Sequence, residues 1–166
     1  MTSMTKHTLV NCFSLRARIG WQGLRSDEFK TEGPYLVTGV DFHNGRVDWD
    51  DCYHVTEERY AQDKGIQLHE HDLLITKDGT IGKTAVVVDC SEKATLNSGV
   101  FVVRAINNEV VPEFLHYVLH SRWFDLFVRN VLTGSTIKHL NQEKFYKFSF
   151  EAPDVPTQKK IVEVLE

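Results

Sequence analysis

Residues 72–83 constrain the fold of this chain more than any other segment. The apolar run 73–75 leads into a polar turn that contains Gly79 and Gly82, and a second apolar run, residues 84–88, follows the turn. This order predicts a strand, a tight loop and a second strand, with backbone amides and two lysine side chains at the tip of the loop. A tip of this kind suits a phosphate group or the edge of a nucleic-acid base.

The loop does not have the pattern of a Walker phosphate loop. The pattern Gly-x4-Gly-Lys-Thr requires a glycine five residues before Gly82, and that position is Lys77. A Walker loop is also followed by a helix, whereas residues 85–88 are typical of a strand. Nucleotide hydrolysis at this loop is therefore not expected.

The composition fits one globular domain. The chain has 166 residues, of which 42% are hydrophobic and 25% are charged, which allows a sizeable core. No apolar run approaches the roughly 18 residues that a membrane span needs, and residues 1–10 do not resemble a signal peptide. The spacing of Cys12, Cys52 and Cys90 matches neither a zinc site nor a disulfide framework. We therefore expect a cytoplasmic protein without a cofactor or a metal.

The charge of the chain is unevenly distributed. The formal net charge is -4, which argues against a strongly electrostatic, non-specific nucleic-acid binder. Residues 48–72 carry a net of six negative charges, and residues 116–147 carry a net of three positive charges. This polarity could orient the protein on DNA, but charge alone favours the simpler interpretation of two solvated faces.

The apolar patterns predict an α+β fold. Residues 114–131 repeat apolar side chains every three or four positions, which predicts one amphipathic helix. The pair Asn44-Gly45 predicts a hairpin turn, because both residues accept positive φ. The other expected helices are a short one within residues 56–63, one that Asn141 caps, and a final one from Gln158. The expected strands are residues 35–38, 72–77, 84–89, 99–104 and 148–150.

Four stretches, taken together in their order and spacing, resemble the target recognition domain of the specificity subunit of type I restriction–modification systems. They are residues 33–47, 72–82, 134–140 and 148–165. The last stretch is similar to the beginning of the conserved spacer helix of that family. The resemblance extends from Arg16 to the end of the sequence.

The resemblance implies a twisted, mostly antiparallel sheet with flanking helices for residues 1–155, and the start of a long spacer helix at residues 156–166. It implies sequence-specific recognition of one half of a split double-stranded DNA site, without catalysis by the chain itself. The implied partners are a modification subunit, which binds S-adenosylmethionine and methylates adenine, and a restriction subunit. A complete subunit carries two such domains, whereas this chain holds one.

The candidate DNA-contacting residues have cationic, aromatic or short polar side chains. Cations suit phosphates, and carboxylates or hydroxyls suit base edges. Each region also has a plain structural interpretation. Residues 77–83 would be a hairpin with glycines at positive φ, and residues 133–139 would be a helix C-cap followed by a turn. The arginines near Trp21 would lie over a buried tryptophan. The candidates are Lys77, Asp78, Thr80, Lys83, Ser135, Thr136, Lys138, His139, Arg18 and Trp21.

The final helix carries an apolar stripe of Ile161, Val162 and Leu165 that has few partners left in this chain. Because an unpartnered apolar stripe tends to find a partner, we expect either a weak homodimer through this helix or a mobile end. A protein-interaction module that uses only this stripe is one alternative function.

Two further functions remain open. The recognition part of a related type II restriction–methylation enzyme would carry the same motifs. A metal-dependent DNA nuclease would bind its metal ion through Asp48, Asp51, His71 and Asp72. His69 and His71 do not by themselves predict a zinc site, because no further Cys/His cluster lies nearby in the sequence.

Overall fold

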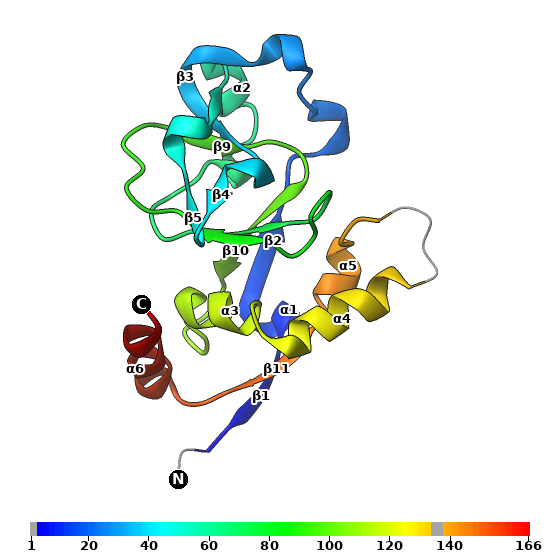
Figure 1. The fold of residues 1–166 in the computed structure, drawn as a ribbon, viewed down its shortest axis with the longest axis vertical. Coiled ribbons are helices and arrows are strands. Elements are labelled where there is room, and N and C mark those ends of the chain that lie inside the picture. Colours follow the sequence, from blue (N-terminus) through cyan, green and yellow to red (C-terminus); the bar gives the residue numbers. More distant parts are fainter. Residues whose placement is uncertain (1–2, 134–137) are drawn as a thin grey trace.

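The computed structural model describes residues 3–133 and 138–166, without the side chain of Trp21. These residues form three sheets and six α-helices (Figure 1), and none of the helices has the length and hydropathy of a membrane span. The strands are β1 Thr5–Thr8, β2 Phe13–Arg16, β3 Lys30–Val37, β4 Phe42–His43, β5 Arg46–Val47, β6 Tyr53–His54, β7 Leu73–Thr76, β8 Thr84–Val86, β9 Ala94–Leu96, β10 Val100–Ala105 and β11 Ser149–Ala152. The helices are α1 Leu9–Cys12, α2 Glu57–Ala61, α3 Pro112–Val118, α4 Arg122–Leu132, α5 Gln142–Phe145 and α6 Val155–Leu165.

A six-stranded sheet forms the centre of the fold. Its strand order is β2-β10-β7-β8-β5-β4, and every pair is antiparallel except β5 with β8. A three-stranded sheet has the order β6-β3-β9, and β1 pairs with β11 in an antiparallel ribbon. The α+β class with a mostly antiparallel sheet is therefore confirmed.

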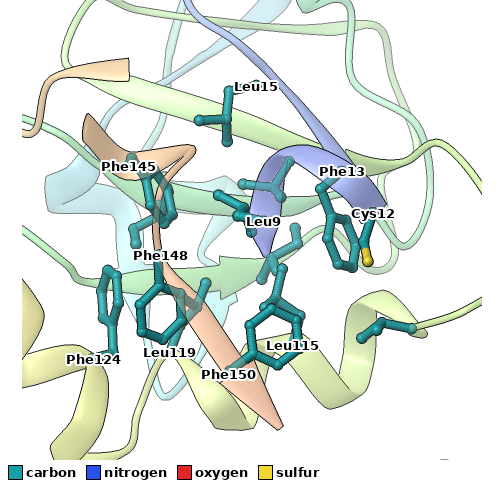
Figure 2. Packing of buried hydrophobic residues seen from close by; sticks show 14 of the residues in the cluster. Leu9, Cys12, Phe13, Leu15, Leu115, Leu119, Phe124, Phe145, Phe148 and Phe150 are labelled. Carbon is teal, nitrogen blue, oxygen red and sulfur yellow. The ribbon is translucent and has the colours of Figure 1, made fainter. Parts of the chain in front are cut away.

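Both faces of the central strands are buried, which explains why their sequences are continuously apolar. Leu73 and Ile75 belong to a cluster that packs on the helices, whereas Leu74 between them belongs to a second cluster shared with the three-stranded sheet. Figure 2 shows the first cluster, in which Phe150 of β11 lies beside Leu115 of α3 and Phe148 lies beside Phe124 of α4.

The expected single helix over residues 114–131 is two helices. Helix α3 ends at Val118 and α4 begins at Arg122. Between them, the amides of His120 and Ser121 donate to carbonyls three residues earlier, at 3.0 Å each, which tightens the chain into a turn. The apolar period continues through this turn because both helices pack on the same cluster.

The hairpin turn at Asn44-Gly45 is confirmed. The φ angles of Asn44 and Gly45 are 52° and 76°, and β4 pairs with β5 across the turn. Behind the turn, a Cβ on Gly45 would lie 3.3 Å from Nε2 of His116. Burial and the neighbouring ring of His120 lower the pKa of His116 to about 4, so this packed ring is neutral at pH 7.

Helix α6 begins at Val155, earlier than expected, because the side chain of Asp154 caps it and Pro156 lies in its first turn. The expectation of an unpartnered stripe was wrong for two of its three residues. Val162 is buried and Ile161 packs against the main cluster, because α6 lies against α3. Leu165 remains 54% exposed.

The buried side chain of Gln158 anchors α6 to the domain. Its Oε1 accepts a hydrogen bond from the amide of Val111 at 2.9 Å, and its Nε2 donates to the carbonyls of Glu109 at 3.0 Å and Pro153 at 2.8 Å. One amide group therefore satisfies three backbone groups around the start of α3 and α6.

Replacing Gln158 by Met keeps a similar volume and removes all three of these hydrogen bonds. Because buried polar groups then lack partners, the free energy of unfolding should fall by about 2–4 kcal/mol in urea denaturation. Lys159→Met, at an exposed position on the same helix, should change it by less than about 0.5 kcal/mol. Equal losses in the two variants would show that Gln158 does not anchor the helix.

Candidate nucleic-acid interface

A threonine hydroxyl at the base of the β7–β8 loop shapes the loop. Oγ1 of the buried Thr76 accepts a hydrogen bond from the amide of Lys83 at 2.9 Å and donates to the carbonyl of Thr80. Gly79 and Gly82 have φ angles of 67° and 89°, in the left-handed region that glycine accepts without strain. The loop therefore has a defined shape, and its tip faces solvent.

The main chain of Lys77 joins three segments of the fold. Its amide donates to the carbonyl of Gly99 at 2.8 Å, and its carbonyl accepts from the amide of Leu140 at 2.6 Å. The next residue, Asp78, forms an isolated β-bridge with His139. The loop after β7 and the segment before Leu140, which are far apart in the sequence, consequently lie side by side.

An open groove of about 400 Å³ lies beside this junction. Gly39 is required at the groove, because a Cβ there would lie 2.5 Å from the methyl carbon of Thr76. Val40 is 75% exposed, although nothing in its sequence context distinguishes it from an ordinary loop residue. The groove is lined by Thr38, Gly39, Val40, Thr76, Asp78, Gly79, Thr80, Lys83, Ser98 and Gly99.

The two lysines of the loop have different surroundings. Nζ of Lys77 lies 3.4 Å from a carboxylate oxygen of Asp78 and 5.8 Å from the ring centroid of Phe101. Lys83 is exposed, and its Nζ lies 3.4 Å from the carbonyl of Gly39. The charge of Lys83 is therefore the more available to a phosphate, whereas Asp78 offsets part of the charge of Lys77. Lys138 and His139 are also exposed.

Arg18 does not belong to this surface, which corrects the expectation that it contacts DNA. It is 3% exposed, and its guanidinium donates to the carbonyl of Leu96 at 2.8 Å and to the hydroxyl of Thr95 at 3.3 Å. Burial lowers the pKa of Arg18. The other candidates, Ser135, Thr136 and the side chain of Trp21, lie outside the described residues.

The residues of the nuclease alternative do not form one cluster in the described part of the chain. Asp48 and Asp51 group with His43, and neither His71 nor Asp72 joins them. Asp72 instead receives hydrogen bonds at 3.0 and 2.8 Å from Arg104. A carboxylate held in such an ion pair is a poor metal ligand.

A family model matches most of the chain. The model described as the type I restriction modification DNA specificity domain matches residues 22–166. The chain belongs to this family. No match is found among curated proteins. Because the match covers most of the chain, the resemblance seen in the sequence is confirmed.

Solved structures with low sequence identity share the fold of this specificity domain. One solved structure concerns the assembly and conformational transition of the type I R-M system. A chain in it aligns with 98% of the present chain, with a TM-score of 0.72 and 16% identity. The HsdS subunit from Thermoanaerobacter tengcongensis has a TM-score of 0.69, 16% identity and 98% coverage. The type IIG restriction endonuclease BpuSI has a TM-score of 0.64, 12% identity and 96% coverage. The chain spans 37%, 36% and 26% of the lengths of these three chains.

The hydroxyl of Thr76 is expected to determine the shape of the loop. Thr76→Val keeps the volume and leaves the amide of Lys83 without its partner, so the free energy of unfolding should fall by about 1–3 kcal/mol. Hydrogen exchange at the Lys83 amide should accelerate beyond this global effect. The exposed Thr80→Val should lose less than about 0.5 kcal/mol. Unchanged exchange at Lys83 in Thr76→Val would contradict this role.

Proposed function

We propose that this specificity domain recognises a short sequence of double-stranded DNA through the groove and the adjoining residues Lys138 and His139. The backbone junction at Lys77 carries the proposal, because it sets two candidate DNA-contacting segments on one edge of the sheet. Family membership supports DNA recognition as the function. Loops held on a rigid sheet are also the usual place for binding residues.

The side chains at this edge divide into two roles. Lys83 and Lys138 would neutralise phosphates and set the position of the domain on the duplex. Asp78 and Thr80 would read base edges, because a carboxylate accepts from cytosine N4 and a threonine meets either base or a thymine methyl. The exposed Val40 at the groove adds an apolar contact suited to a thymine methyl. Binding would thus combine positioning with readout.

The proposed consequence of recognition is the delivery of a partner enzyme to an adenine. The partners would be a modification subunit, which methylates the flipped base, and a restriction subunit. Helix α6 would begin the spacer that separates two recognition domains, and the protein would act in the cytoplasm. The similarity to BpuSI favours one second candidate, the recognition part of a type II restriction–methylation enzyme.

Phosphate contacts should be visible in the salt dependence of binding. Lys83→Ala and Lys138→Ala should each weaken binding to every DNA sequence and lower the slope of log K against log salt by roughly one unit. The measurement is fluorescence anisotropy with a random-sequence duplex at several salt concentrations. Lys160→Ala, an exposed lysine on α6, is the matched control and should leave the slope unchanged. Wild-type slopes for both Lys83→Ala and Lys138→Ala would place the interface elsewhere.

Base contacts should instead change the preferred sequence. Asp78→Ala and Thr80→Val should each shift discrimination at one base pair by roughly 1–3 kcal/mol while the salt slope stays constant. Binding selection from a randomised duplex library, with the chain alone and with the modification subunit, measures this shift. An unchanged preference in both variants, at normal affinity, would remove these two residues from the readout.

The chain itself should have no catalytic activity. Because Asp72 is paired with Arg104, we expect no cleavage of plasmid DNA by the purified chain with Mg²⁺. We also expect no methylation of DNA in the absence of the modification subunit. Mg²⁺-dependent cleavage of plasmid DNA by the purified chain, lost in Asp48→Asn or Asp51→Asn, would favour the nuclease alternative over DNA recognition alone.

A further inference from the structure

Three potential metal ligands meet at a junction that does not line the groove. His7 lies on β1, Cys12 ends α1, and Glu109 lies in the turn between β10 and α3. Cys12 is buried at the edge of the main cluster, as Figure 2 shows. The side chain of His7 is 11% exposed and that of Glu109 is 59% exposed, so the junction opens to solvent on the glutamate side.

The three ligand atoms form a nearly equilateral triangle. Nδ1 of His7 lies 3.6 Å from Sγ of Cys12, and Oε2 of Glu109 lies 3.8 Å from that sulfur and 3.7 Å from that nitrogen. Zinc bonds are about 2.0 Å to nitrogen or oxygen and about 2.3 Å to sulfur, so two ligands of one tetrahedral ion lie roughly 3.3–3.6 Å apart. A bound ion would replace the thiol proton that Cys12 donates to Glu109, and this proton would leave to solvent. The triangle would need only a small contraction.

The chemistry of the donors selects the ion. A thiolate, an imidazole and a carboxylate are the donors that zinc combines in proteins, whereas magnesium and calcium prefer oxygen ligands alone. We propose that His7, Cys12 and Glu109 bind one Zn²⁺ ion, with a water molecule in the fourth position on the solvent side. The proposal is independent of the DNA-binding function.

The group of His43, Asp48 and Asp51 differs from this triangle in its donor atoms and its exposure. Nε2 of His43 and Oδ2 of Asp51 lie 2.9 Å apart, the length of a direct hydrogen bond. Oδ1 of Asp48 also accepts from the amide of Asp50 at 3.1 Å. The group is largely exposed and lacks a sulfur ligand, so no metal site is proposed there.

Hydrogen bonds of the backbone hold the ligands of the triangle in place. The amide of Ile106 donates to the carbonyl of Cys12 at 2.9 Å, and the side chain of Asn107 donates to the carbonyl of Asn11 at 2.8 Å. The turn that carries Glu109 is thereby tied to α1. Support of this kind around the ligands is typical of metal sites and reduces the cost of organising them.

The site would also connect the metal to the spacer helix. Gln158 of α6 donates to the carbonyl of Glu109, whose side chain would bind the ion. Binding would therefore join β1, α1 and the turn that receives α6. Because the ion binds the folded state, it should stabilise the domain and the docking of α6 together.

The test uses the tag-free chain, stripped of metal and fully reduced, titrated with Co²⁺ as a spectroscopic substitute for Zn²⁺. We expect one equivalent of Co²⁺ to produce a thiolate-to-cobalt charge-transfer band, which excess Zn²⁺ removes. Cys12→Ser should abolish the band, and His7→Gln and Glu109→Gln should weaken binding at least tenfold. Cys90→Ser, a free cysteine outside the triangle, is the matched control and should bind as the wild type does.

Zn²⁺ should also raise the Tm of the wild type and slow hydrogen exchange in α6, and it should do neither in Glu109→Gln. Glu109 is largely exposed, so this variant decides the outcome even if Cys12→Ser does not fold. The proposal is overturned if no charge-transfer band forms with one equivalent of Co²⁺. It is also overturned if Glu109→Gln binds with wild-type affinity, or if Cys90→Ser removes the band.

Discussion

The proposed DNA-binding edge depends on the two hydrogen bonds of the Lys77 main chain. They hold the loop after β7, the turn at Gly99 and the segment before Leu140 at one point. Both faces of β7 are covered by apolar clusters, so the strand itself offers no surface to a ligand. In the proposed function, recognition falls to the loops at the end of β7, which these backbone bonds hold at one edge.

The shape of the β7–β8 loop and the proposed phosphate contacts depend on different atoms at this edge. The buried hydroxyl of Thr76 and the absence of a side chain at Gly39 determine how closely the loops approach each other. The side chains of Lys83, Thr80 and Val40 are exposed to solvent. Tip residues can consequently vary without disturbing the core, which is what a domain needs if related proteins are to read different sequences on one scaffold.

The parts of the fold that could be predicted from the sequence are those set by local chemistry. Asn44-Gly45 forms its turn because both residues accept positive φ, and Asn141 caps its helix through its own side chain. The break at Ser121 was missed because the apolar period runs through it unchanged. The short strand β9 was missed because three residues carry too little pattern to distinguish it from a loop.

The parts that escaped prediction depend on contacts between distant residues. The composition around Arg18 allowed DNA contact as well as a structural role, and its contacts with Leu96 and Thr95 show that its guanidinium is buried in the interior. The bridge from Asp78 to His139 and the triangle of His7, Cys12 and Glu109 have no signal in sequence spacing. Asp78 and His139 lie far apart along the chain, as does Glu109 from His7 and Cys12, so no local motif joins either set.

The central claim is that the edge beside Lys77 faces DNA. A photo-crosslinking amino acid at Val40 tests it most directly, with the same substitution at Val164 as a control, because the two side chains are 75% and 82% exposed. With DNA selected by the chain and the proposed modification subunit, crosslinks should form at position 40 and map to the preferred sequence, while position 164 should give none. Crosslinking at position 164 with none at position 40 would contradict the account.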